Sequence, residues 1–375
     1  MSKKVVILTS GHPPKDERIF HKIGRTLVNS GFSVTIISSV LDADFTENNI
    51  HIVGFKGNNL NKKEKIFNLK ALLQTEAPDI VICSEPITIV AAYQYKKNSQ
   101  KKIRIISDIT EWYPENVALK QKGLRRITSY IILFLFNVYA SNLADRLIIG
   151  ESNKLKRYRF IAPFKKKIII GYYPVLRFFH YSPPLFDGKK LVLCYAGLIS
   201  IERGILNLLE AAQSVALKNP GIGVTLRIIG KFQYEEEEMI FKEKISGEKT
   251  LRIEMVPWGK YEEVSEKLEG ADICFDLRNY SFVYRNSLPI KIFEYMASGK
   301  PVIYSDIKPV RNELNVSSFG FLVDPKNIDE ISERVTEYIR NPALLIEHSK
   351  AARHEAETRY NWKVLEPGLI EFISG

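Results

Sequence analysis

Short β-branched runs alternate with helical patterns along most of the chain, and this alternation constrains the fold most strongly. Between the first two runs, Phe20, Ile23 and Leu27 fall at helical spacing, and Gly31 ends that helix. A βαβ order of this kind predicts a parallel sheet covered by helices on both faces. In the first half the predicted strands are 5–9, 33–38, 50–55, 79–84, 103–108, 146–149 and 168–171.

The alternation stops at residues 174–190 and then begins again. Pro174, Pro183, Pro184 and Gly188 disfavour regular structure there, which predicts an interdomain linker. Beyond it the predicted strands are 191–196, 224–229, 252–256, 273–277 and 301–305. The predicted helices are 203–218, 235–244, 261–268, 289–298, 329–340 and 342–359. We therefore predict an α/β protein with two Rossmann-like domains, 1–173 and 191–359, whose parallel sheets face each other across a cleft. The last segment, 360–375, is expected to pack back on the first domain.

The composition is typical of a globular enzyme. With 375 residues, 45% hydrophobic and 26% charged, the chain can bury two cores and is neither disordered nor fibrous. Cys83, Cys194 and Cys274 lie far apart in apolar runs, which predicts reduced buried thiols rather than disulfides or a zinc cluster. The first apolar run is too short for a signal peptide, so we expect a cytoplasmic location.

Positive charge is concentrated in the first half of the chain. Residues 1–180 hold 29 Lys and Arg against 14 Asp and Glu, whereas the rest hold 25 against 29. Such asymmetry is typical of contact with an anionic partner, either nucleic acid or a membrane surface, although a solvated basic face is the simpler alternative.

Three segments that follow predicted strands are candidates for ligand contact. Ligands of open α/β sheets bind beyond the carboxyl ends of the strands, where helix-start amides face anions. The segments are Ser-Gly-His-Pro-Pro-Lys-Asp at 10–16, Ala-Gly-Leu-Ile-Ser-Ile-Glu-Arg-Gly at 196–204, and Asn-Ser-Leu-Pro-Ile-Lys-Ile-Phe-Glu within 286–303. None contains the GxGxxG pattern of nicotinamide sites.

The residue types of these segments favour a nucleotide site. Arg203 lies where a helix is predicted to start, a place that suits an anion better than a cation unless a phosphate binds there. Lys291 and Glu294 lie three residues apart on one helix face. They could form a surface ion pair, or they could contact phosphate and the two ribose hydroxyls of a nucleotide.

Four motifs in order resemble family 4 glycosyltransferases across nearly the whole chain. They are HPP-x-D-x-RIF at 12–20, DITEWYPE at 108–115, the Arg203-Gly204 pair, and LPIKIFEYMASGKPV at 288–302. The resemblance implies the GT-B fold, a retaining reaction, and a nucleotide-sugar donor bound mainly by the second domain. It also implies a bacterial surface-polysaccharide role.

The resemblance also implies roles for individual residues. Glu294 is similar to the ribose-binding second glutamate of the family's E-x7-E motif, Arg203 to a diphosphate-binding cation, and Gly11 to the small residue beside the donor phosphates. The other donor-site candidates are Gly197, Lys291 and the backbone amides near Ser287 and Leu288.

This sequence departs from the family pattern at three positions. Asn286 stands where the family usually has its first glutamate, and Leu198 stands where many relatives have a second phosphate-binding arginine. Thr110 occupies the place of a common active-site histidine. These departures concern the sugar and the catalytic details more than the class of donor.

The reaction requires stabilisation of negative charge on a departing diphosphate. We assign this to Arg203 and the helix-start amides and expect no metal requirement and no cofactor; Asp42-Ala43-Asp44 is interpreted as a solvated loop. Asp108 or Glu111 could accept the acceptor's proton, unless the leaving phosphate does so. The other acceptor-side candidates are His12 and Thr110, and the catalytic set is completed by Asn286.

An apolar run at 127–136 follows Lys120, Lys122, Arg125 and Arg126. It is too short to span a bilayer but suits an interfacial helix with a basic flank, or a core helix. We expect peripheral contact with anionic lipid, a glycan or lipid-linked acceptor, and no nucleic acid. Alternatives left open are a nucleotide-sugar epimerase, a phosphorylase, and a non-catalytic sugar-nucleotide-binding or nucleic-acid-binding protein.

Overall fold

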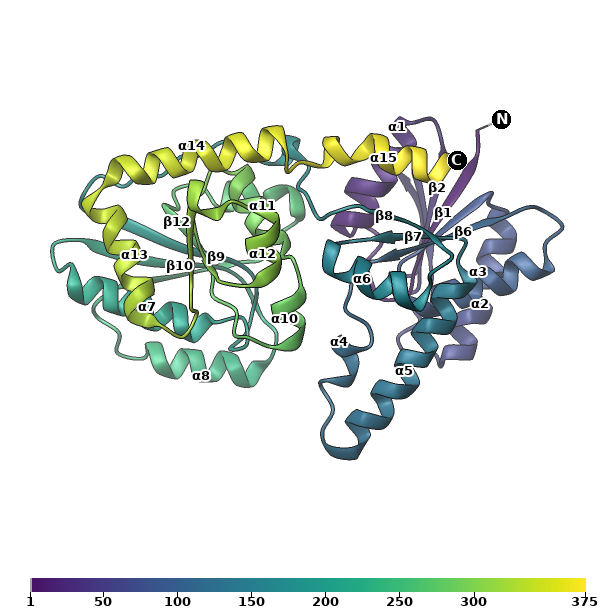
Figure 1. Cartoon of the computed structure of the whole chain (residues 1–375), viewed down its shortest axis with the longest axis horizontal. Helices are drawn as coiled ribbons and strands as arrows, with labels where there is room; N and C mark the ends of the chain where they lie inside the picture. Colours follow the sequence, from purple (N-terminus) through teal and green to yellow (C-terminus); the bar gives the residue numbers. More distant parts are fainter. Residues whose placement is uncertain (1) are drawn as a thin grey trace. The chain divides into compact units, whose positions relative to one another are not determined.

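The computed structural model describes residues 2–375, which divide into two compact units. The first unit contains residues 2–172 together with Leu365–Gly375, and the second contains Tyr173–Val364. Each unit is built on one sheet of mainly parallel strands with helices on both faces (Figure 1). The α/β class and the two parallel sheets predicted from the alternating pattern are therefore confirmed.

The sheet of the first unit has eight strands in the order β3-β4-β2-β1-β5-β6-β7-β8. All neighbouring strands are parallel except β3 and β4. The strands are β1 (Lys4–Thr9), β2 (Ser33–Ser38), β3 (Ala43–Glu47), β4 (Ile50–Gly54), β5 (Ile80–Cys83), β6 (Arg104–Ile109), β7 (Arg146–Ile149) and β8 (Lys166–Ile169).

Strand β3 corrects the interpretation of Asp42-Ala43-Asp44 as a loop. Ala43 and Asp44 begin a strand that pairs with β4 in antiparallel register. The turn between β3 and β4 has Asn48 and Asn49 at φ 52° and 62°, the positive values that a two-residue hairpin turn requires. The Oδ1 atom of Asp44 lies 2.9 Å from Nε2 of His51 across the pair, so this carboxylate has a partner in the sheet.

Helices of the first unit cover both faces of its sheet. On one face Leu69, Ile89, Ala140 and Tyr158 pack against strand residues in a buried apolar cluster. On the other face the C-terminal segment is held by side chains of the sheet, since Arg104 donates to the carbonyl of Ile373 at 2.6 Å. The helical elements are a π-helical segment η1 (Glu17–Gly24), α1 (Arg25–Asn29), α2 (Lys62–Glu76), α3 (Pro86–Asn98), α4 (Glu115–Ala118), α5 (Gly123–Leu143), α6 (Ser152–Ile161) and the end of α15 (Trp362–Ser374).

The second unit contains a six-stranded parallel sheet in the order β11-β10-β9-β12-β13-β14. The strands are β9 (Lys190–Ile199), β10 (Gly223–Phe232), β11 (Arg252–Pro257), β12 (Ile273–Asp276), β13 (Val302–Ser305) and β14 (Gly320–Val323). The helices are α7 (Ile205–Lys218), α8 (Glu235–Ile245), α9 (Val264–Lys267), α10 (Phe282–Asn286), α11 (Ile290–Ala297), α12 (Lys308–Glu313), α13 (Ile328–Arg340) and α14 (Pro342–Thr358), with short 3₁₀ turns η2 (Leu176–Phe178), η3 (Tyr261–Glu263) and η4 (Val316–Ser318).

The segment 174–190 packs as part of the second unit. Phe179 is buried in a core cluster of that unit, and the backbone N–H of Leu185 donates to Asp272 at 2.7 Å. The backbone N–H of Ser182 donates to the carbonyl of Ser298 at 3.1 Å. Its irregular backbone is thus held by hydrogen bonds, as a proline-rich segment against a folded domain requires.

Each sheet has a point where the order of strands reverses. Strand β1 lies between β2 and β5, and β9 lies between β10 and β12. Ligands of open parallel sheets bind beyond the carboxyl ends of the strands at such points. The residues that contact a ligand are therefore expected at the carboxyl ends of β1 and β9.

Candidate functional site

The end of β9 and the turn after it have a backbone that only glycine can supply. Gly204 has φ +81°, and a Cβ atom there would lie 1.8 Å from the carbonyl oxygen of Leu277. The turn that carries Arg203 therefore lies against the end of β12. The ends of the neighbouring strands β9 and β12 thus meet at one edge of the sheet. Helix α7 begins at Ile205, so Arg203 lies in the turn before the helix rather than in it.

Three cationic side chains surround one buried carboxylate beside this turn. Asp276, the last residue of β12, is fully buried and accepts hydrogen bonds from Nε and Nη2 of Arg278, the shortest at 2.7 Å. Nζ of Lys291 on α11 lies 3.9 Å from the same carboxylate, and Arg203 and Arg278 both face the ring of Tyr284. Although burial raises the pKa of Asp276, Arg278 and Lys291 hold it below its usual value.

Lys291 lacks the hydrogen-bond partner that a buried ammonium group needs. Its Nζ atom makes no hydrogen bond in the structure and lies 3.6 Å from the centre of the Tyr195 ring. Burial lowers the pKa of Lys291 well below its usual value, and Arg278 and Arg203 lower it further. A buried cation without a hydrogen-bond partner is costly unless an anion compensates it. The cluster can therefore bind a multiply charged anion.

Gly197 determines where Lys291 lies. It has φ +133°, and a Cβ atom there would lie 2.4 Å from Cε of Lys291. We expect Gly197→Ala to displace Lys291 and weaken binding of a nucleoside diphosphate at least tenfold, measured by isothermal titration calorimetry.

The matched control for this variant is Gly247→Ala. Gly247 also has positive φ, at +82°, but a Cβ atom there meets no atom within 4 Å. It also places alanine at a positive φ, at a cost of about 1 kcal/mol, but without touching Lys291. Equal loss of binding in the two variants would show that strain, not the position of Lys291, matters.

Helix α11 and the residues before it carry the remaining donor-side candidates. Glu294 is buried one turn after Lys291, and Leu288 is buried in the core cluster beneath α11. Nδ2 of Asn286 donates to the carbonyl of Phe282 at 2.7 Å. The hydroxyl of Ser287 donates to the carbonyl of Val283, also at 2.7 Å. The structure thus uses these two side-chain donors to end α10.

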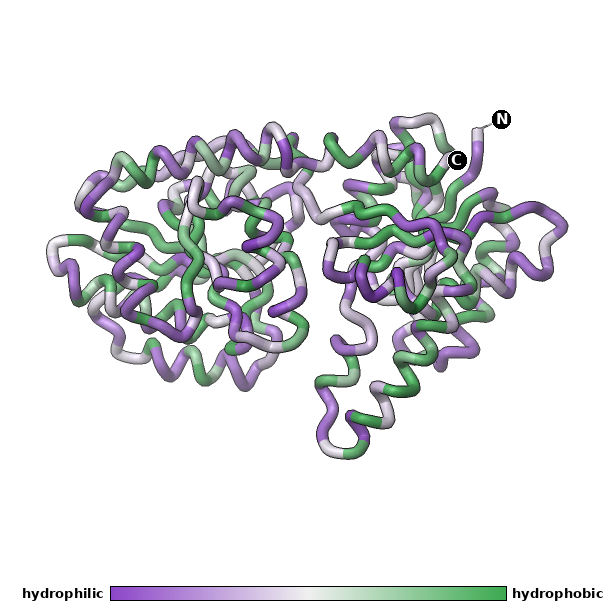
Figure 2. The backbone as a smooth tube through the Cα atoms, viewed as in Figure 1, coloured by the Kyte–Doolittle hydropathy of each residue, from purple (hydrophilic) through white to green (hydrophobic). Residues whose placement is uncertain are grey.

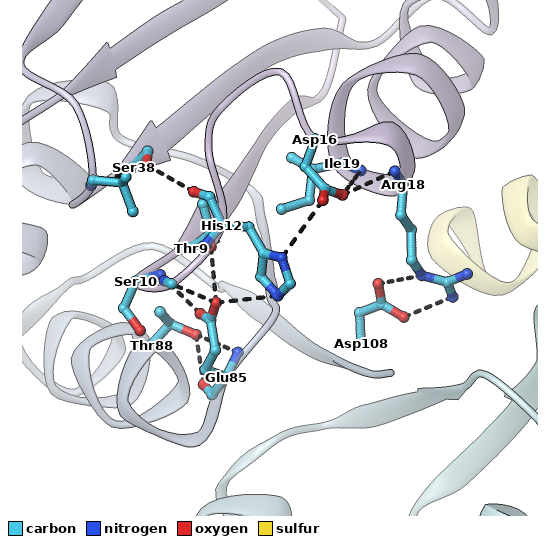
Figure 3. A network of polar contacts seen from close by, with 12 residues as sticks. Thr9, Ser10, His12, Asp16, Arg18, Ile19, Ser38, Glu85, Thr88 and Asp108 are labelled. Atoms are coloured by element: carbon cyan, nitrogen blue, oxygen red, sulfur yellow. Dashed lines mark hydrogen bonds and ion pairs between the residues drawn. The ribbon is translucent and has the colours of Figure 1, made fainter. Parts of the chain in front are cut away.

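In the first unit, Glu85 lies against the loop after β1 (Figure 3). Its carboxylate accepts from the hydroxyl of Thr9 at 2.8 Å and from the backbone N–H groups of Ser10 and Gly11 at 2.8 and 3.1 Å. The N–H of Gly11, a donor-phosphate candidate, is therefore bonded to a carboxylate of its own unit. Sequence reasoning missed Glu85, although it lies two residues after β5, the strand that neighbours β1.

His12 lies between two carboxylates of this network (Figure 3). Nδ1 is 3.5 Å from Oδ2 of Asp16, and Nε2 is 3.8 Å from Oε1 of Glu85. The contact with Asp16, which burial opposes, raises the pKa of His12 to about 9, and the charges of Glu85 and Glu111 contribute. His12 is therefore protonated at neutral pH.

The raised pKa of His12 predicts a pH-dependent contribution to stability. A group with a raised pKa stabilises the fold fully below its unfolded value, near 6.5, and loses this effect as the pH rises through about 9. Urea unfolding should show a free-energy loss in His12→Gln that is largest near pH 6 and disappears above about pH 9.5. In an Asp16→Asn background this dependence should shrink; a pH-independent loss would contradict the ion pair.

Asp108, a proton-acceptor candidate, is fully engaged by Arg18. Nε and Nη2 of Arg18 donate to its two carboxylate oxygens at 2.7 and 2.8 Å, and both side chains are buried (Figure 3). Arg18 also donates to the carbonyls of Ile170 and Gly171 at 3.0 Å. This pair connects η1, β6 and the segment after β8, which is a structural task rather than that of a base.

The other acceptor-side candidates line a cavity of about 220 Å³ in the first unit. Thr110 is fixed there through its carbonyl, which accepts from the hydroxyl of Tyr172 at 2.7 Å and from Nζ of Lys154. Glu111 is exposed at this cavity. The wall also includes His12, Glu85, Asp108, Tyr113, Asn137 and Tyr158.

Comparisons with known proteins identify a family model that matches most of the second unit. Residues 179–359 match the family model of glycosyl transferases group 1, a range that includes Arg203, Arg278, Lys291 and Glu294. The chain is a GT-B glycosyltransferase. No curated protein sequence matches it significantly.

Solved structures similar to this glycosyltransferase share its fold at low sequence identity. Sucrose-phosphate synthase of Thermosynechococcus elongatus has a TM-score of 0.76 at 14% identity, covering 99% of this chain and 98% of that one. HepE of Anabaena in complex with UDP-glucose has 0.74 at 14% identity, covering 99% of both. The lipopolysaccharide outer core galactosyltransferase WaaB has 0.57 at 19% identity, covering 99% and 95%.

Proposed function

We propose that this glycosyltransferase moves a sugar from a nucleotide-sugar donor to a glycan or lipid-linked acceptor, with retention of anomeric configuration, in cell-surface polysaccharide assembly. The observation that supports a nucleotide-sugar donor is the buried Nζ of Lys291, which lies near Arg203 and Arg278 and has no hydrogen-bond partner. A diphosphate supplies two or more negative charges to such a cluster.

Charge compensation in the second unit supports this assignment. When the bond between the anomeric carbon and the diphosphate breaks, negative charge grows on the leaving oxygen. Arg203, Arg278 and Lys291 stabilise that charge in a position shielded from water, where preorganised cations act most strongly. Because three protein cations supply this stabilisation, we propose that the transfer needs neither a metal nor a cofactor.

The nucleoside part of the donor is assigned to Glu294. Its carboxylate can accept hydrogen bonds from both ribose hydroxyls, and it lies one helical turn from Lys291 on α11. The backbone amides near Ser287 and Leu288 lie just before that helix, where N–H groups can bind an anion such as phosphate. Asn286 takes the place of a carboxylate near the donor sugar and offers an uncharged amide there.

The acceptor is assigned to the cavity of the first unit. Glu111 is the exposed carboxylate of that cavity, whereas Asp108 is bonded to Arg18. We assign Glu111 and Thr110 to acceptor contact, with protonated His12 as a hydrogen-bond donor. The proton released by the acceptor goes either to Glu111 or to the leaving phosphate.

Contact with an anionic membrane supports a lipid-linked acceptor. No helix within residues 2–375 combines the length and apolarity needed to cross a bilayer. Helix α5 nevertheless exposes Leu124, Ile127 and Ile131 next to Arg125 and Arg126, which suits the interfacial region of anionic lipid. WaaB, one of the structurally similar proteins, is a lipopolysaccharide outer core galactosyltransferase, which is consistent with a surface-polysaccharide role.

A donor screen tests the proposed function. Uridine, guanosine, adenosine, thymidine and cytidine diphosphates are compared by thermal shift, followed by the sugar nucleotides of the base that binds. Ligand at 100 times its dissociation constant stabilises the native state by about 2.7 kcal/mol, which is readily detected. Donor turnover with an acceptor, followed by NMR of the new glycosidic bond, then reads the anomeric configuration. If all five diphosphates left the melting temperature unchanged, the proposal would be overturned.

A further inference from the structure

The last turn of α6 and the turn that follows it before β8 expose two phenylalanines, Phe160 and Phe164, at almost full extent. Phe160 is 84% exposed and Phe164 is 96% exposed. Residues 152–170 contain no Asp or Glu and seven basic residues, of which Lys154 pairs with Glu151 and Arg157 with Glu115. The other five are Lys156, Arg159, Lys165, Lys166 and Lys167.

Hydrogen bonds hold this turn in one conformation. Nζ of Lys167 donates to the carbonyls of Ala162 and Lys165 at 2.6 and 2.7 Å. Nδ2 of Asn142, near the end of α5, donates to the carbonyl of Ile161 at 2.8 Å. The two rings are thus carried on an ordered turn, so their exposure is a property of the fold.

The same turn lies at the end of an apolar stripe on α5. Leu124, Ile127, Ile131, Leu135 and Tyr139 are each more than half exposed and recur every three or four residues, so they share one helix face. Figure 2 shows hydrophobic positions recurring along the length of this helix. At 1.5 Å per residue, this stripe extends about 22 Å along the helix.

Asn142 continues that face by three residues and is bonded to the turn that carries the phenylalanines. In Figure 1, α4 and the first turns of α5 extend away from the sheet of this unit, whereas the end of α5 lies against it. The stripe therefore connects the free end of α5 with the turn after α6.

We propose that Phe160 and Phe164 form a second membrane contact, which inserts into an anionic bilayer together with the stripe on α5. The basic residues around both parts complement anionic headgroups, and phenylalanine and aliphatic side chains suit the boundary between headgroups and acyl chains. Nucleic acid would leave the isoleucines and leucines of the stripe exposed. Two separated contacts fix the orientation of the first unit on the membrane, which a single helix does not.

This proposal rests on the membrane contact included in the proposed function, and a site-specific probe separates the two. All three native cysteines are buried, so a cysteine introduced at position 164 can be labelled selectively with an environment-sensitive dye. Phe164→Cys carries the dye in the test, and Phe67→Cys carries it as the control. Phe67 is 66% exposed and lies on α2 in the same unit.

The labelled proteins are mixed with vesicles of phosphatidylcholine with and without phosphatidylglycerol. We expect a blue shift and increased emission of the dye at position 164 with phosphatidylglycerol vesicles only, and no change at position 67. Vesicle flotation of Phe160→Ser/Phe164→Ser should show about tenfold weaker binding than the unmodified chain. The double variant should keep its diphosphate affinity, because the changes lie in the other unit.

Two results would overturn the second contact. In the first, the chain floats with phosphatidylglycerol vesicles but the dye at position 164 stays in water, which leaves α5 as the membrane contact. In the second, the dye responds to single-stranded RNA and not to vesicles. If the unmodified chain does not float at all while diphosphate binding persists, membrane contact fails and the assigned donor chemistry stands.

Discussion

Lys291→Met is expected to lower kcat/KM by about 10²- to 10³-fold while leaving the fold intact or more stable. Losing one preorganised charge that faces a developing anion has an effect of this size in other enzymes. Methionine matches the lysine stem in length and can pack on Tyr195, beside which Nζ lies without a hydrogen bond. Because the variant removes a buried ammonium that makes no hydrogen bond, thermal unfolding without ligand should not lose stability.

Lys300→Met is the matched control for this prediction. Lys300 is also buried, but its Nζ donates to the carbonyl of Ala271 at 2.8 Å and to that of Ser182. Its removal leaves these carbonyls without their donor and should cost about 1–3 kcal/mol of stability. The two lysines should therefore respond oppositely: loss of activity at one and loss of stability at the other. A stability loss in Lys291→Met as large as that in Lys300→Met would contradict an anion-binding role.

Arg278→Met is expected to destabilise the second unit by about 3–5 kcal/mol. The substitution leaves Asp276 fully buried without the three hydrogen bonds that its carboxylate now accepts from Arg278. Urea unfolding measures the loss. The double variant Arg278→Met/Asp276→Asn should recover most of it, because the uncompensated charge is gone.

Diphosphate binding separates the structural and binding roles of Arg278. The double variant should fold but still bind a nucleoside diphosphate about tenfold or more weakly, because one cation of the cluster is missing. Recovery of stability together with full affinity would limit Arg278 to supporting Asp276. Failure of the double variant to recover stability would contradict the description of the pair itself.

Local signals predicted most of the fold. Strand β2 and helix α11 occur almost at the predicted residues. A β-branched run or a helical periodicity lies entirely within one element, so it can be recognised without knowing which other elements pack against it. Strand β3 was missed because Asp44, Phe45 and Thr46 are exposed and give no alternating pattern. The signal that could have found it is the pair Asn48-Asn49 between two short runs, which suits a two-residue hairpin.

The candidate site could be predicted only in part. Arg203, Lys291 and Glu294 lie in segments whose helix-start position is visible in the sequence. Arg278 could not be connected with them, because its role depends on the end of β12 lying beside the start of α11. The Asp-x-Arg sequence that begins at the last residue of a buried strand was the available signal. For the same reason, the bonds of Asp108 to Arg18 were not visible.

The most direct test of this account is a crystal structure of the chain with the nucleoside diphosphate selected by the donor screen. The account predicts that phosphate oxygens lie within hydrogen-bond distance of Nζ of Lys291 and of the Arg203 guanidinium, with both ribose hydroxyls on Glu294. A diphosphate bound elsewhere on the second unit, with Nζ of Lys291 still without a partner, would contradict it.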